Sequence, residues 1–220
     1  MFHSQKHVFW QALLITILIF SIGIVLGIVL ENWRTSKIST LAENSQLDFL
    51  DIKLQSEIYS NEEFNCEVAV NENFKFAEQI YEEAKMLDRY ESASRLTEDL
   101  KLQHKKYDIL RGMLLINSIK IKKQCNSDYY DIIYFYKYNS EDLDLKAKQK
   151  VFSRILEQVK ETKGSDVLLI PIAADNDISS INLLLDKYNI KQEQLPAILI
   201  NNKIKITEIQ TVDDVLNYLN

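Results

Sequence analysis

The sequence predicts an α/β protein in three parts: an N-terminal transmembrane helix, a helical hairpin region and a C-terminal domain of alternating strands and helices. Three observations support this prediction. Residues 8–30 contain no charged side chain, residues 36–124 repeat apolar side chains at helical spacing, and residues 128–220 alternate β-branched segments with helical ones. A short tail, residues 1–7, precedes the transmembrane helix.

The uncharged run from Val8 to Leu30 is long enough to cross a membrane. Its 23 residues extend about 34 Å as a helix, against a hydrocarbon core of about 30 Å. Trp10 and Trp33 lie near its two ends, where tryptophan favours the membrane interface. A cleaved signal peptide is the alternative, but its apolar part is shorter and ends in small residues. We therefore expect a retained anchor.

Two features of this span bear on assembly and orientation. Gly23 and Gly27 form a small-xxx-small motif, which allows two transmembrane helices to pack closely and so permits a homodimer. Lys6 precedes the span, and Arg34 and Lys37 follow it. The flanking charges therefore barely favour either orientation.

Three helices are predicted between residues 36 and 124. The first follows the span without an intervening Gly or Pro, so the two can be continuous, and it breaks near residues 60–63. The second runs from Glu67 to Tyr90 and the third, capped by Ser94 or Thr97, ends near Lys123, so residues 67–123 form a hairpin. We expect the apolar stripes of these helices to pack within the hairpin, with a coiled-coil dimer through the first helix as the alternative. The stripes are, in chain order, Leu47, Leu50, Leu54 and Ile58; Val70, Phe74, Ala77, Tyr81 and Ala84; and Leu96, Leu100, Tyr107, Leu110, Leu114 and Ile121.

The hairpin brings the two cysteines of the chain to the same end. Cys66 begins the second helix and Cys125 ends the third, and the two helices differ in length by only about 6 Å. We expect a disulfide bond, which would close a loop of about 60 residues and stabilise the fold by about 4 kcal/mol. Two unrelated buried thiols and a redox-active pair are the alternatives. A structural disulfide indicates an oxidising compartment, which favours an extracytoplasmic domain with the N-terminus inside.

The last part of the chain alternates between strands and helices. Aromatic and β-branched residues predict strands over 129–136, 167–172 and 197–200, and the turn Asn201-Asn202 leads into a further strand over 203–209. A helix that ends at Gly164 follows the first strand, a helix capped by Asp177 follows the second, and a helix capped by Thr211 and Asp214 ends the chain. The inner faces of the first two helices carry Ala147, Val151, Phe152, Ile155, Leu156 and Val159, and Ile181, Leu184, Leu185 and Tyr188.

This order of elements, β-α-β-α-β-β-α over residues 128–220, resembles the thioredoxin fold. Leu195-Pro196-Ala197 precedes the final hairpin, and the resemblance implies that Pro196 is the cis-proline that begins the third strand in that family. Pro171 lies inside the second strand, where proline removes a backbone donor. That strand is therefore expected at an edge of the sheet.

The sequence departs from the thioredoxin family at the active site. The family carries Cys-x-x-Cys after the first of these strands, whereas residues 136–142 stand there in this chain, with Asn139 and Asp142 at the former active-site position. Disulfide exchange needs a thiolate, and no cysteine follows Cys125. No catalytic residue is predicted, and we expect the domain to be a binding or scaffolding module. A divergent thiol-disulfide oxidoreductase using Cys66 and Cys125, and a structural subunit of a membrane complex, are the alternatives.

Other chemistry is not indicated by the sequence. The net charge of −6, without a basic block, argues against a nucleic-acid partner. His104 has no neighbour at metal-ligand spacing and is expected at the solvated surface. No metal site or cofactor is predicted, and the acids Glu141, Asp142 and Asp144 are expected to serve the N-terminus of the next helix. The expected partners are the lipid bilayer and a protein that the sequence does not identify.

Overall fold

The structure is a computed structural model that describes residues 5–92, 98–209 and 211–219. The chain divides into two units, residues 1–46 and residues 47–220, which are described separately below. Its three N-terminal helices are α1 (Gln5–Asn61), α2 (Cys66–Ser92) and α3 (Glu98–Cys125). The caps predicted at Ser94 and Thr97 lie outside the described residues.

The first unit is the N-terminal part of α1. Within the described residues, Val8–Trp33 is the one segment that is long and apolar enough to cross a membrane. Helix α1 continues without a break to Asn61, because no Gly after Gly27 and no Pro interrupts it. The predicted continuity of the anchor with the next helix is therefore confirmed.

The end of α1, residues 47–61, packs in the second unit through a face that differs from the predicted stripe. Ile52 and Tyr59 are buried, whereas Leu47, Leu50 and Leu54 are each at least 60% exposed. The face of α3 that contacts this part of α1 is partly polar. The Lys120 ammonium donates to the Ser56 carbonyl oxygen at 2.8 Å, and the Asn117 amide donates to the Ile52 carbonyl oxygen. The prediction that Leu47, Leu50, Leu54 and Ile58 pack inward is wrong.

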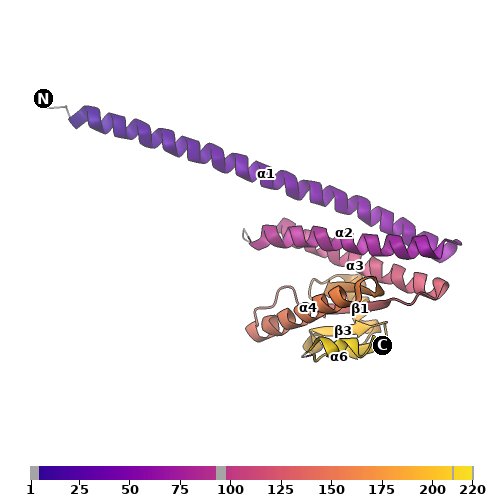
Figure 1. The fold of residues 1–220 in the computed structure, drawn as a ribbon. Coiled ribbons are helices and arrows are strands. Elements are labelled where there is room, and N and C mark those ends of the chain that lie inside the picture. The colour runs from indigo at the N-terminus through magenta and orange to yellow at the C-terminus, as the bar shows by residue number, and fades with distance from the viewer. Residues whose placement is uncertain (1–4, 93–97, 210, 220) are drawn as a thin grey trace. The chain divides into compact units, whose positions relative to one another are not determined.

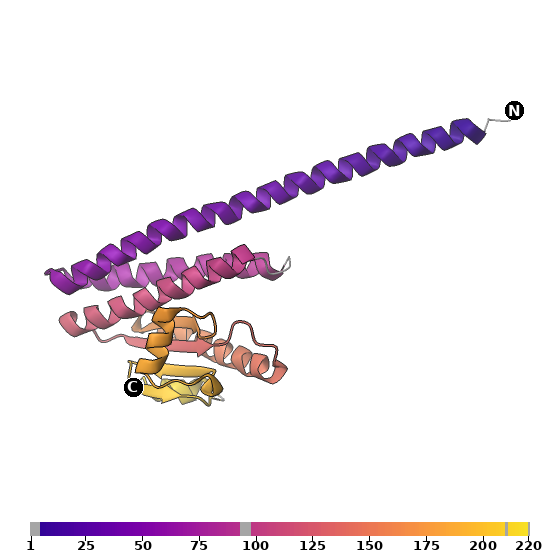
Figure 2. The same cartoon turned by 180° about the vertical axis from the view of Figure 1, so that it is seen from behind.

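Helices α2 and α3 form the predicted antiparallel hairpin and lie side by side in both views (Figures 1 and 2). The stripe of α3 is buried as predicted, from Leu100 to Ile121, with Leu96 outside the described residues. On α2 the buried residues outside the predicted stripe are Ala69, Asn73, Phe76, Ile80, Glu83 and Leu87. Of the predicted α2 stripe only Ala84 is buried, so this prediction is largely wrong.

The second half of the chain is a four-stranded mixed sheet in the order β2-β1-β3-β4. Strand β1 pairs in parallel with β2 and antiparallel with β3, and β3 pairs antiparallel with β4. The predicted edge position of the Pro171 strand is confirmed, since β2 ends the sheet. The strands are β1 (Tyr130–Tyr136), β2 (Val167–Ala173), β3 (Ala197–Ile200) and β4 (Ile204–Ile206).

Helices cover both faces of the sheet. On one face α4 and α6 enclose a core around Ile132, Phe152 and Val215. On the other face lie α3 and α5, where Ile181 of α5 reaches within 3.3 Å of the position that a Cβ would take at Gly112 of α3. These elements are α4 (Leu143–Lys163) and α6 (Val212–Leu216), α5 (Ser179–Lys187), and two short 3-10 turns, Gly164–Asp166 and Gln192–Gln194.

Most predicted turns and caps are confirmed, but one cap, on α5, and part of the predicted inner face of α4 are wrong. Asn201 and Asn202 take positive φ at the hairpin, and Thr211 and Asp214 form the predicted capping box. Asp177 does not cap α5, whose N-cap is Ile178, because Asp177 itself takes a φ of 50°. On α4, Ala147 and Val151 are exposed, since the sheet covers only the face around Phe152, Ile155, Leu156 and Val159.

Asp131, in the central strand, ties α3 to the sheet through a buried polar cluster. Its carboxylate accepts from the Ser118 hydroxyl at 2.5 Å and lies 3.4 Å from the Lys122 ammonium. Its backbone N–H donates to the Asn201 side chain at 3.0 Å. Burial raises the pKa of the Asp131 carboxyl above its ordinary value of 3.8, although Lys122 and Ser118 oppose this shift.

This raised pKa makes stability depend on pH. The folded state holds the Asp131 proton to a higher pH than the unfolded state, so the free energy of unfolding falls as the pH rises from 3.8 through the raised pKa. We expect Asp131→Asn to remove this contribution to the change of the free energy of unfolding with pH. Urea unfolding of the full chain in detergent, repeated across this window, measures it. An identical slope in the variant would contradict the assignment.

Candidate functional site

Residues 137–142, where the resemblance places the former active site, form a loop held by a carboxylate. Asp175 accepts hydrogen bonds from the backbone N–H groups of Tyr138 and Asn139, at 2.7 and 2.8 Å. Asp142 is the N-cap of α4 and accepts from the backbone N–H groups of Asp144 and Leu145. Asn139 and Asp142 are therefore exposed residues in a structural turn, and Asp142 has the helix-end role expected of it.

Pro196 and the two cysteines lie at opposite ends of the second unit. The Leu195–Pro196 peptide bond is cis, and the next residue, Ala197, pairs with Phe135 near the end of β1. At that same end Asp108 of α3 reaches the last residue of β2. Cys125 follows Asp108 by 17 helical residues, which is about 25 Å along α3.

Cys66 and Cys125 are joined in the predicted disulfide bond, with an S–S distance of 2.07 Å. Beside it, Tyr59, Ala69 and Ile121 form a small apolar cluster. No thiol is left free in the chain, whose only cysteines are these two. The disulfide therefore links helices, far from Pro196, and the structure does not bring it to the position where thioredoxin chemistry would take place.

Gly23 and Gly27, predicted to mediate packing within the membrane, lie in the exposed first half of α1. A Cβ added at either position would meet nothing within 4 Å among the described residues. Their role in dimerisation stays a prediction.

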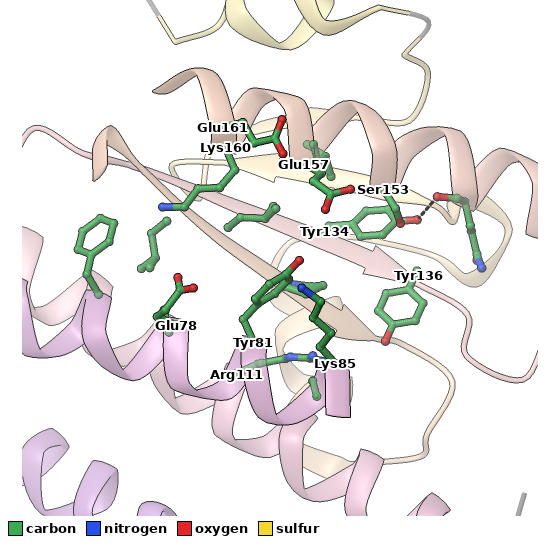
Figure 3. Close-up of a pocket in the computed structure, with 18 of the residues that line it drawn as sticks. Glu78, Tyr81, Lys85, Arg111, Tyr134, Tyr136, Ser153, Glu157, Lys160 and Glu161 are labelled. Atoms are coloured by element: carbon green, nitrogen blue, oxygen red, sulfur yellow. Dashed lines mark hydrogen bonds between the residues drawn. The ribbon is translucent and has the colours of Figure 1, made fainter. Parts of the chain in front are cut away.

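One concave site of the second unit is a groove that the sequence did not predict. It encloses about 940 Å³ between α2 and α4, with the edge strand β2 and the end of β1 at its base. Figure 3 shows side chains of α2 pointing across the groove towards side chains of α4. The labelled residues of these two walls are Glu78, Tyr81 and Lys85, and Ser153, Glu157, Lys160 and Glu161.

The two walls differ in chemistry. The α2 wall is mixed: Phe74, Ala77, Tyr81 and Ala84 of the predicted stripe face the groove as an apolar strip, and polar residues flank it. The flanking residues are Asn71, Lys75, Glu78 and Lys85. The α4 wall is polar and carries both signs of charge, from Lys150 to Glu161. The stripe that was expected to pack inside the hairpin is therefore a wall of the groove.

Lys160 closes one end of the groove. Its ammonium donates to the carbonyl oxygens of Gly164 and Val167, at 2.8 and 2.7 Å, and lies 5.3 Å from the centre of the Phe74 ring. Burial lowers the pKa of Lys160, and the nearby Glu78 carboxylate partly offsets this effect. Lys160 thus joins α4 to both β2 and α2.

Aromatic side chains line the other end of the groove, where Tyr136, Tyr138 and His104 lie. The His104 and Tyr138 ring centroids are 4.2 Å apart, and His104 is buried. The prediction that His104 is a solvated surface residue is wrong, because α3 is covered by α2 on one side and by the sheet on the other. Among the described residues, no group of three or more His, Cys, Asp or Glu is placed to hold a metal ion.

Arg111 and Asp108 form a buried ion pair at the base of this end. The Arg111 guanidinium lies 3.4 Å from the Asp108 carboxylate, which also accepts from the Ala173 backbone N–H at 3.1 Å and from the Asn176 amide at 2.6 Å. Burial raises the pKa of Asp108, and Arg111 partly opposes the shift. This cluster was not predicted from the sequence.

Comparison with known proteins identifies no family for this chain. By sequence, the chain matches no protein-family model and no curated protein.

Proposed function

We propose that this chain is a single-pass membrane protein whose thioredoxin-like domain has no catalytic cysteines and binds a partner protein. The observation that carries the proposal is the open groove between α2 and α4, which places an apolar strip of α2, Phe74, Ala77 and Tyr81, beside the unpaired edge of a sheet. Concave sites of this size are usual for small ligands, and an unpaired sheet edge beside such a site also suits a segment of a partner protein. The strand order and the place of Pro196 support the thioredoxin-like assignment.

Two further observations support the extracytoplasmic, non-enzymatic form of this proposal. Both cysteines are engaged in the disulfide, and disulfides form mainly in oxidising compartments. The loop at residues 137–142 carries no thiol, and the Asp175 carboxylate holds its backbone in place. The domain therefore has a ligand-sized groove and lacks the group that thioredoxin chemistry requires.

An exposed apolar face on α1 favours a second candidate, a structural subunit of a membrane complex. Leu47, Leu50 and Leu54 lie at 60–68% exposure. Apolar side chains clustered on one exposed face often mark a protein interface. In this case the main contact of the chain would lie on α1, outside the groove.

Photo-crosslinking distinguishes the two candidates. A photoreactive phenylalanine analogue is placed at Tyr81 in the groove, at Leu50 on α1, or at Leu183, which is 71% exposed on α5. In membranes of cells that naturally make the protein, we expect a discrete adduct from Tyr81 and none from the Leu183 control. Gel mobility and mass spectrometry of the adducts provide the measurement.

Each outcome of this experiment decides between the candidates. An adduct from Leu50 alone would replace the groove proposal with the structural-subunit reading. Equal adducts from all three positions, or none from Tyr81, would contradict a specific binding groove.

A further inference from the structure

The backbone of β2 presents a short stretch of unpaired groups to the groove. The Ala174 N–H donates to the Tyr136 carbonyl oxygen at 2.8 Å, towards β1. Because backbone groups alternate in direction along a strand, the groups of Val167, Leu169, Pro171 and Ala173 point away from β1.

The two ends of this outer edge are already bound by side chains. The Val167 carbonyl oxygen accepts from Lys160, and the Ala173 N–H donates to Asp108. Between them stand the N–H and carbonyl of Leu169 and the carbonyl of Pro171, which has no N–H. Among the described residues none of these three groups has a hydrogen-bond partner, and both residues line the groove.

The groove has the length of a short extended peptide. From Asn71 to Lys85 its α2 wall spans about 21 Å, which an extended chain of about six residues covers. A strand added beside β2 would turn alternate side chains to opposite faces of the sheet. One set would meet the α2 wall along its apolar strip of Phe74, Ala77 and Tyr81, and the other would meet the charged α4 wall.

We propose that the groove receives an extended segment of the partner protein, with alternating apolar and polar residues, which adds to the sheet beside β2. Strand addition is an established mode of peptide recognition, in which backbone hydrogen bonds supply affinity and alternate side chains supply specificity. This inference rests on the proposed binding function and specifies the class of ligand. The partner would donate two backbone N–H groups, to Leu169 and Pro171, and accept from the Leu169 N–H.

The test uses the full chain in lipid nanodiscs and a displayed library of short peptides with alternating apolar and polar residues. One selected peptide is synthesised, and a series of analogues carries a single backbone N-methyl group at successive positions. We expect affinity to fall roughly tenfold at two positions separated by one residue and to change little between them, because only those N–H groups face β2. Fluorescence polarisation measures the affinities.

A matched pair of protein variants tests the same contact from the other side. Leu169→Pro removes the N–H and is expected to weaken binding roughly tenfold, whereas Leu169→Ala keeps the N–H and should weaken it less. If circular dichroism shows that Leu169→Pro is misfolded, the N-methyl series on the natural chain decides alone.

The outcomes separate this inference from the proposed function. Suppose that a peptide prevents formation of the Tyr81 adduct, but that its affinity does not fall at alternate N-methylated positions. This result would overturn strand addition and leave the binding groove in place. A library without a binder would also overturn strand addition, and the crosslinking from Tyr81 would still judge the groove.

Discussion

Replacing Asp108 by alanine is expected to lower the free energy of unfolding by about 3–5 kcal/mol, the usual cost of breaking a buried ion pair from one side. The variant leaves the Arg111 guanidinium without its partner at a site where its side chain is 10% exposed. It also leaves the Ala173 N–H and the Asn176 amide without the acceptor that they share. Urea unfolding of the full chain in detergent, followed by circular dichroism, measures the change.

Two variants control this prediction. Asp186→Ala removes an exposed aspartate on α5 and should change stability by less than about 0.5 kcal/mol. Asp108→Leu combined with Arg111→Met removes both charges, so it should be less destabilised than the sum of the two single variants. A strictly additive double variant would argue that the two side chains do not interact.

Removing the disulfide has an effect of similar size. Replacing Cys66 and Cys125 by alanine is expected to lower the free energy of unfolding by about 4 kcal/mol, because the bond closes a long loop in the unfolded chain. Alanine keeps the surroundings apolar, so the loss reports mainly the cross-link. The measurement is denaturant unfolding of both proteins with and without a reductant.

The reductant supplies the control, since the double variant has no bond to break. Reduced natural chain and double variant should therefore unfold at the same denaturant concentration. A natural chain that is insensitive to reductant would contradict the assigned stabilisation. Alkylation of thiols in intact cells, before and after reduction, reports whether the bond forms there and so tests the extracytoplasmic assignment.

The two apolar stripes of α1 and α2 show where prediction from periodicity ends. Spacing at three and four residues identifies an apolar helical face, and Phe74, Ala77 and Tyr81 do lie on one such face, which lines the groove. It does not say whether the covering surface belongs to the same chain. In α2 the face that packs in the hairpin includes the polar Asn73 and Glu83, so it carries a weaker signal than the face that lines the groove.

Helix α3 explains why the polar part of the site was missed. It is covered on two sides, so polar residues such as Asp108, Arg111 and His104 are buried at positions that look like an exposed face in the sequence. Charged residues are fully buried only when they are paired. Asp108 and Arg111 pair within α3, but the groups that donate to Asp108 from the sheet side, Ala173 and Asn176, are more than 60 residues away along the chain. No local pattern links them to Asp108.

The sheet was more predictable because its signals are local. Strand residues stand between turn and cap residues such as Gly164 and the Asn201-Asn202 pair, which take positive φ as expected. Pro171 alone was enough to predict that β2 lies at an edge, since a proline inside the sheet would cost a ladder hydrogen bond. The groove beside that edge depends on how α2 packs, which the strand pattern does not contain.

The capped edge of β2 also bears on the solubility of the domain. An exposed edge strand can recruit copies of itself and start open-ended aggregation. Here Lys160 and Asp108 occupy the ends of the edge, Pro171 withholds a donor, and the strand at the opposite edge of the sheet, β4, has three residues. Such an edge leaves only the middle of β2 unpaired and offers no template for growth, so the sheet can keep an open edge without polymerising.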